Sequence, residues 1–143
     1  MYEQFYHLAS EPFRLSPDYR FCYRYSQFST VRRYLELALH RAEGVMMVSG
    51  EPGTGKTTLV DDLVGSVEQQ RILVARLVST RMELPDLLRM VAFAIGVETR
   101  SREASGILAE ITAHLRSLDR SGKRVLLVMD EAQHLDTGAV REL

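Results

Sequence analysis

Little in the sequence suits a secreted, metal-binding or membrane-spanning protein. A single cysteine, Cys22, rules out an internal disulfide, and the four histidines show no metal-ligand spacing with it. No apolar run approaches the roughly 20 residues of a membrane span, and the polar, aromatic N-terminus does not resemble a signal peptide. We therefore expect a reduced protein of the cytoplasm without a metal bound by cysteine or histidine. Attachment to a membrane would come from a partner or from a missing C-terminal part.

The sequence also has no large excess of charge of either sign. The 143 residues carry 18 basic and 19 acidic side chains, which gives a net charge of −1. Nucleic acids and anionic membranes attract strongly basic surfaces, so this balance counts weakly against a nucleic-acid partner without excluding one. Lysine is scarce, and only Lys56 and Lys123 accompany 16 arginines. The length and the 45% share of hydrophobic residues indicate one soluble domain with its own core, or part of one.

Helical and extended patterns alternate along the chain. Apolar residues recur at helical spacing in four segments, which predicts helices over 29–42, 57–69, 84–96 and around 107–118. Short continuous apolar runs predict buried strands over 45–49, 71–79 and 124–129. From residue 45 onward the order is βαβααβ with short links. The predicted fold class is therefore α/β, a mainly parallel sheet flanked by helices.

The helix predictions include end residues and buried faces. Ser29 or Thr30 would cap the first helix, and Gly44 would follow its end. Gly96 and Gly122 would end the third and fourth helices. The residues predicted to face inward are, helix by helix, Val31, Tyr34, Leu35, Ala38 and Ala42; Leu59, Val60, Leu63, Val64 and Val67; Leu87, Leu88, Val91, Ala92 and Ile95; and Ile107, Leu108, Ile111, Leu115 and Leu118.

A glycine-rich stretch, SGEPGTGKTTL, joins the apolar run at 45–49 to the following helix. From Gly50 to Thr57 it fits the pattern G-x-x-x-x-G-K-[ST], in the strand–loop–helix context that this pattern requires. Glycines let the backbone turn its N–H groups toward a phosphate, and the helix adds its positive N-terminus. The residues expected to bind the nucleotide form the glycine loop, namely Gly50, Glu51, Pro52, Gly53, Thr54, Gly55, Lys56, Thr57 and Thr58. Lys56 would reach the β and γ oxygens as a catalytic cation, and the hydroxyl of Thr57 would bind Mg²⁺.

The apolar run VLLVM ends in an acidic pair, Asp130 and Glu131. Parallel sheets bind ligands beyond the C-terminal ends of their strands, so Asp130 would hold the Mg²⁺ shell opposite Thr57. Glu131 would polarise the attacking water as the catalytic carboxylate. A purely structural alternative is that Asp130 and Glu131 act as the N-cap and a first-turn acidic residue of a helix that follows the strand. Together with the glycine loop, the pair favours hydrolysis of ATP over transfer of phosphate to a small molecule.

Several motifs together form one pattern that covers nearly the whole chain. They are Met1-Tyr2, Phe5-Tyr6, Pro12-Phe13 and Pro17-Asp18 in the N-terminal segment, then GEPGTGKTTL, DLLRMVAFAIG and DEAQHL. In this pattern the chain resembles the AAA+ ATPases found as component A of the general secretion pathway and beside exosortase and exopolysaccharide loci. Its glycine loop and acidic pair correspond to their Walker A and Walker B motifs. DEAQ also occurs in a class of helicases, but their further motifs are not found between 74 and 124. Tyr19 and Phe28 depart from the proline and histidine usual in the ATPases.

The resemblance implies a P-loop NTPase core of the AAA+ type in residues 29–143. It implies a strap in residues 1–28, which would pack near the adenine through Pro12, Phe13 and Pro17. Hydrolysis of MgATP would power assembly on protein partners of a secretion or exopolysaccharide export machine, in the cytoplasm or at the inner face of its membrane. Members of the family usually form homo-oligomers, so the resemblance also implies a possible homo-oligomer.

The resemblance also concerns what lies downstream. Family members continue past DEAQ-x-L into a fourth strand, an arginine finger and a helical lid. That strand lies between the strands expected at 45–49 and 124–129, so we expect these 143 residues to be truncated after the Walker B strand. Two alternatives stay open: a DNA-associated AAA+ ATPase of the transposition or replication type, and a nucleotide-gated interaction module that does not turn ATP over.

Overall fold

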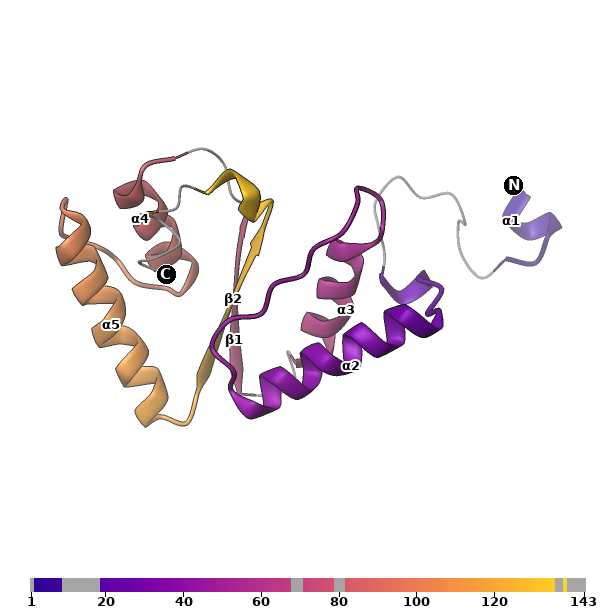
Figure 1. Ribbon diagram of the computed structural model, residues 1–143, viewed down its shortest axis with the longest axis horizontal. Helices are drawn as coiled ribbons and strands as arrows, with labels where there is room; N and C mark the ends of the chain where they lie inside the picture. Colours follow the sequence, from indigo (N-terminus) through magenta and orange to yellow (C-terminus); the bar gives the residue numbers. More distant parts are fainter. Residues whose placement is uncertain (1, 9–18, 68–70, 79–81, 136–137, 139–143) are drawn as a thin grey trace. The chain divides into compact units, whose positions relative to one another are not determined.

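The computed structural model describes residues 2–8, 19–67, 71–78, 82–135 and 138. In chain order its elements (Figure 1) are α1 (Tyr2–Phe5), η1 (Tyr19–Phe21), α2 (Ser26–Arg41), α3 (Lys56–Val67), β1 (Ile72–Val78), α4 (Leu84–Ala94), α5 (Ala104–Arg120), β2 (Arg124–Asp130) and η2 (Ala132–His134). They belong to two compact units, Met1–Leu63 and Val64–Leu143. Within the described ranges, no helix has the length and apolar character of a membrane span.

The second unit is built on a parallel ladder. β1 pairs with β2 in a register that runs from Ile72 opposite Arg124 to Val78 opposite Asp130. Helices α4 and α5 contact each other and the strands, and Figure 1 shows both helices on one side of the ladder. Parallel strands need a crossover connection, which these two helices supply. The predicted combination of parallel strands with flanking helices is therefore confirmed in this unit.

Apolar side chains from β1, α4 and α5 form the core of the second unit. Its buried members are Ala75, Leu77, Leu88, Val91, Ala92, Ile95, Ile107 and Ile111. All five residues predicted to face inward from α4 are buried, and Gly96, with φ of 82°, follows that helix as predicted. The prediction for α5 is wrong at Leu115, which is 38% exposed. The helical period therefore identifies the whole buried face of α4 but only the first turns of that of α5.

In the first unit, α2 contacts the beginning of α3. The buried residues of this contact are Phe28, Leu35, Leu59 and Leu63, and the partly buried ones around them are Cys22, Leu39, Met46 and Val48. The helix predicted over 57–69 is confirmed as far as Val67, and residues 68 and 69 lie outside the described part of the chain. The short α1 and η1, in the N-terminal segment, were not predicted.

The ends of α2 differ from the prediction. The helix begins at Ser26 with no side-chain cap bond, so neither Ser29 nor Thr30 caps it. Instead, the hydroxyl of Thr30 donates to the carbonyl of Ser26 at 2.9 Å, a bond typical of threonine inside a helix. At the other end Ala42, with φ of 55°, takes the left-handed conformation, so the helix has already ended before Gly44.

The buried face of α2 is turned relative to the prediction. Val31 and Tyr34 are 41% and 69% exposed, and Ala42 is exposed as well. The buried residues of the helix are Phe28, Leu35 and Ala38. Because Phe28 precedes the predicted start, its ring was left out of the expected face, although it adds more apolar area to the core than Val31 could.

The strand predicted over 45–49 is wrong for the structure as described. This segment joins no ladder among the described residues. Its side chains nevertheless alternate, since Val45 and Met47 are 92% and 87% exposed while Met46 and Val48 pack partly buried against the core of the first unit. An apolar run becomes a strand only when a neighbour satisfies its backbone hydrogen bonds, and sequence alone does not show that neighbour.

Replacing Leu88 by alanine should lower the free energy of unfolding by about 2–5 kcal/mol, because it leaves a cavity in the core. Leu88 is 1% exposed, whereas Phe93 on the same helix is 86% exposed. The matched control Phe93→Ala should therefore change stability by no more than about 0.5 kcal/mol. Urea unfolding followed by circular dichroism measures both changes. Equal losses in the two variants would show that the buried face of α4 is assigned wrongly.

Candidate nucleotide site

The glycine loop enters α3 through two left-handed residues. Gly53 has φ of 80° and Gly55 has φ of 84°, a region that L side chains adopt only with strain. A Cβ added at either position would meet no atom within 4 Å. Glycine is therefore required here by the backbone angles rather than by lack of space.

Two side chains form hydrogen bonds with backbone carbonyls of the same loop. The ammonium of Lys56 donates to the carbonyls of Gly50 at 2.9 Å and Glu51 at 3.0 Å. The hydroxyl of Thr54 donates to the same carbonyl of Glu51 at 2.9 Å. An ammonium has three donors, so Lys56 keeps one for an anion beside the loop. These two bonds hold the cation at the loop.

The beginning of α3 adds a second source of positive potential. Lys56 is the first residue of this 12-residue helix, and the N–H of Leu59 donates to the carbonyl of Gly55 at 2.9 Å. The N–H groups at the start of a helix carry the positive end of its dipole. The first turn of α3 contains no acidic residue. The loop and the helix start therefore form a local site suited to a phosphate.

The acidic pair follows β2 directly. Asp130 is the last residue of the strand, and its Oδ1 accepts the N–H of Glu131 at 2.9 Å. Glu131 has φ of 56° and stands at the N-cap position of η2, but its side chain makes no cap bond. Its carboxylate instead accepts a short hydrogen bond from the side-chain amide of Gln133. His134 Nε2 lies 3.9 Å from the same carboxylate oxygen, Oε2.

The residues predicted from the sequence fall in both units. The glycine loop belongs to Met1–Leu63, and the acidic pair belongs to Val64–Leu143. The strap residues Pro12, Phe13 and Pro17 lie outside the described residues. Phe5 and Tyr6, from the same segment, are exposed and meet edge to face with ring centroids 5.0 Å apart.

Comparison with known proteins places the chain in a family. A family model described as an AAA domain matches residues 39–143. The chain belongs to this AAA domain family. It is also 28% identical over 144 aligned residues to "General secretion pathway protein A" of Aeromonas hydrophila, an alignment that covers 100% of this chain and 26% of that relative. No solved structure matches the chain. The resemblance seen in the motifs is thus confirmed. The chain spans about a quarter of the length of this relative.

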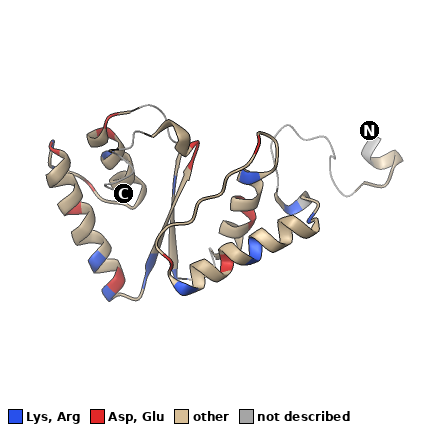
Figure 2. Cartoon of the chain, viewed as in Figure 1, with Lys and Arg blue, Asp and Glu red and all other residues tan. Residues whose placement is uncertain are grey.

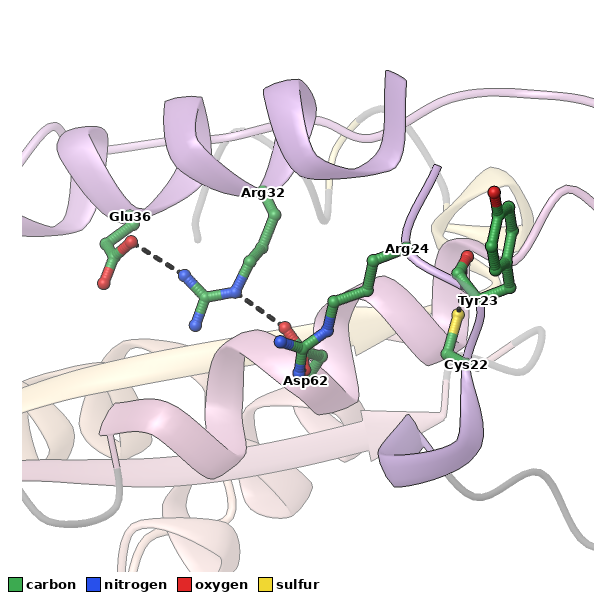
Figure 3. A network of polar contacts seen from close by, with 6 residues as sticks. All are labelled: Cys22, Tyr23, Arg24, Arg32, Glu36 and Asp62. Carbon is green, nitrogen blue, oxygen red and sulfur yellow. Dashed lines mark hydrogen bonds and ion pairs between the residues drawn. The ribbon is translucent and has the colours of Figure 1, made fainter. Parts of the chain in front are cut away.

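One polar cluster of this AAA domain was not predicted. Asp62, on α3, is 4% exposed and accepts hydrogen bonds from two arginines. Arg24 Nη2 reaches Oδ1 at 2.5 Å, and Arg32 Nε reaches Oδ2 at 2.6 Å (Figure 3). Arg32 also donates through Nη1 to Glu36 at 2.7 Å. The only hint in the sequence is an aspartate at position 62, on the apolar face of a predicted helix.

The electrostatics of this cluster follow from burial. The hydrogen bond to Asp62 raises the pKa of Arg32 above its usual value, and the nearby charge of Glu36 adds to the effect. Burial of the guanidinium acts in the opposite direction. A guanidinium whose pKa is raised further stays charged throughout the physiological pH range. Arg32 therefore keeps its positive charge beside Asp62 across this pH range.

Gly55→Ala should destabilise the AAA domain by about 1–3 kcal/mol, because alanine must adopt the left-handed φ at this position. The matched control is Gly44→Ala. Position 44 also has open space around an added Cβ, but its φ lies outside the left-handed range. We expect that control to be neutral or to stabilise by up to about 1 kcal/mol. Thermal unfolding of the two variants, compared with the parent, measures the difference. Equal stability of the two would contradict the loop geometry.

Proposed function

We propose that this AAA domain binds MgATP at the glycine loop and hydrolyses it. The observation that carries the proposal is the loop geometry, in which two left-handed glycines lead into α3 and the ammonium of Lys56 is held at the loop. A phosphate there would meet backbone N–H groups, a helix N-terminus and a cation together. Membership of the AAA family supports a nucleotide as the bearer of that phosphate.

In this proposal each residue of the loop has a part in binding. The nucleotide contacts come from Gly50, Glu51, Pro52, Gly53, Thr54, Gly55, Lys56, Thr57 and Thr58. The backbone N–H groups around Gly53 and Gly55 surround the phosphate oxygens. Lys56 balances the negative charge on the β and γ oxygens and is counted with the catalytic residues because that charge redistributes during hydrolysis.

Thr57 and Asp130 are the residues that would hold Mg²⁺. A hydroxyl and a carboxylate are oxygen ligands of the kind this cation accepts, and it takes its other ligands from water and from the phosphates. When bound, Mg²⁺ withdraws negative charge from the phosphate oxygens. Asp130 suits this role because the ladder fixes its backbone at the end of β2.

Glu131 is the proposed general base. Its carboxylate would accept a proton from the attacking water as the water approaches the γ-phosphorus. Two observations support the assignment. The carboxylate is not used as a helix cap, and the amide of Gln133 donates to one of its oxygens. A positioned carboxylate with a second oxygen available can bind a water and orient it.

The proposed work of this ATPase is assembly. The relative from Aeromonas hydrophila is named as a general secretion pathway protein, and on that basis we place the AAA domain among ATPases that power secretion or exopolysaccharide export. In this setting residues 1–28 serve as a strap before the core that begins at 29. The domain would act on protein partners as a homo-oligomer, in the cytoplasm or at the inner face of its membrane.

A DNA-associated ATPase is the second candidate, and the charge distribution bears on it. Figure 2 shows Lys and Arg interspersed with Asp and Glu along the described helices rather than gathered on one of them. Nucleic-acid binding proteins usually concentrate basic residues on one surface. Salt-dependent retention on DNA would favour this candidate over an export ATPase.

Lys56→Ala should weaken MgATP binding by at least about tenfold, because it removes the side-chain charge that the loop offers to the phosphates. Lys123 is the only other lysine of the chain, and Lys123→Ala is therefore the matched control. It removes the same charge from an exposed position after α5, and we expect the dissociation constant to stay unchanged. Isothermal calorimetry measures both. An unchanged constant in Lys56→Ala would overturn the phosphate site.

Glu131→Gln should leave MgATP binding nearly intact and slow turnover by about 10²-fold or more, the usual scale for a general base. The exposed Glu98 provides the control, and Glu98→Gln should turn ATP over at the parent rate. Phosphate release and ATP affinity are measured on the same samples. A parent protein that binds ATP without releasing phosphate would favour the interaction module. Equal losses of binding and rate in Glu131→Gln would make that residue structural.

A further inference from the structure

A buried carboxylate stands in the apolar contact between α2 and α3. Asp62 follows Leu59 by three positions, so the two residues lie on the same face of α3, and Asp62 is 4% exposed. Leu59 and Leu63 are buried against Phe28 and Leu35 of α2. Apolar contacts of this kind are non-directional, and they tolerate small rotations and shifts of one helix against the other. A hydrogen-bonded charge does not, because its bonds have fixed directions and lengths.

Asp62 is held from two segments of the chain. Arg32 lies on α2 and binds Asp62 through Nε while Nη1 holds Glu36 on the same helix. Arg24 lies before α2, in the segment that follows η1, and binds the other oxygen of Asp62. Figure 3 shows both guanidinium groups directed at the one carboxylate. The two arginines balance the charges of Asp62 and Glu36, so the cluster has no net charge.

This cluster fixes the helix that begins at the glycine loop. Asp62 lies six residues after Lys56 on α3, about 9 Å along the axis at 1.5 Å per residue. A rotation or shift of α3 at Asp62 would therefore be carried to the first turn, where Lys56 and the loop meet. The bonds of Lys56 to the carbonyls of Gly50 and Glu51 fix the ammonium only relative to the loop, and not relative to α2.

We propose that Asp62 is a positioning residue of the nucleotide site. Held by Arg24 and Arg32, it sets the rotation and register of α3 at which the loop amides and Lys56 bind phosphate. The inference rests on the proposed function, since it needs the glycine loop to bind a nucleotide. By linkage, nucleotide binding and the contact of Arg24 with Asp62 then strengthen each other.

Arg24 is the most informative residue to change. Its side chain is 58% exposed, and its removal leaves the pair between Arg32 and Asp62 in place. Arg24→Gln should therefore fold, yet raise the dissociation constant for MgATP by about tenfold, the scale of one charged hydrogen bond. Arg24→Lys should stay within about threefold of the parent, because a single ammonium can replace one N–H donor to Oδ1.

The matched control is Arg33→Gln on α2. Arg33 is exposed, and within the described part of the chain it makes no ion pair or side-chain hydrogen bond. Its removal costs the same positive charge as Arg24→Gln, so it measures the general attraction of a basic side chain for ATP. We expect no change in affinity. Arg32→Lys should resemble Arg24→Gln, because one ammonium cannot replace donors that reach Asp62 and Glu36 in two directions.

Calorimetric titration of the full chain with MgATP tests the inference, and circular dichroism confirms that each variant is folded. The double variant Arg24→Gln with Asp62→Asn should bind no more weakly than Asp62→Asn alone, since Arg24 acts through Asp62. Affinities of Arg24→Gln and Arg32→Lys equal to that of Arg33→Gln would overturn the positioning role while MgATP binding by the parent stands. A parent that binds no MgATP would overturn the proposed function, and this inference with it.

Discussion

The start of α3 is the constraint on which the first unit depends. Gly53 and Gly55 turn the chain through left-handed angles, and the helix begins at Lys56 immediately afterwards. The same helix buries Leu59 against α2 and carries Asp62 into that contact. A loop that only glycine can form without strain is thus continuous with a helix fixed by both apolar packing and charge. This combination presents N–H groups and a cation in a fixed arrangement, which is what phosphate binding requires.

In the second unit, strand pairing fixes the backbone that leads to the acidic pair. The ladder between β1 and β2 extends to Val78 and Asp130, so the first acidic residue stands at the end of a fixed strand. Glu131 then leaves the strand in a left-handed conformation that is rare for a residue with a side chain. Such conformations persist where the surroundings hold them, and here the N–H of Glu131 donates to Oδ1 of Asp130 while its carbonyl accepts the N–H of His134. In the proposed function, Asp130 holds a metal ion and Glu131 activates water.

The sequence predicted local features well and long-range ones poorly. The buried face of α4, its end at Gly96 and the glycine loop all follow from residues close together in sequence. The first turn of α2 was missed because Phe28, which precedes the predicted start, finds its partners on α3. The prediction of a strand at 45–49 was wrong because a strand needs hydrogen-bonding neighbours from elsewhere in the chain. Asp62 could not be recognised either, since Arg24 and Arg32 precede it by 38 and 30 positions.

The claim that the glycine loop holds the phosphates of a nucleotide is tested most directly by hydrogen exchange. Backbone N–H groups that bind phosphate should exchange more slowly once the ligand is present. With saturating MgATP, we predict slower exchange in the peptide that contains Gly53, Gly55 and the first turn of α3, and unchanged exchange in the middle of α5. The account would be contradicted by a protein that binds MgATP while the exchange of the glycine loop stays the same.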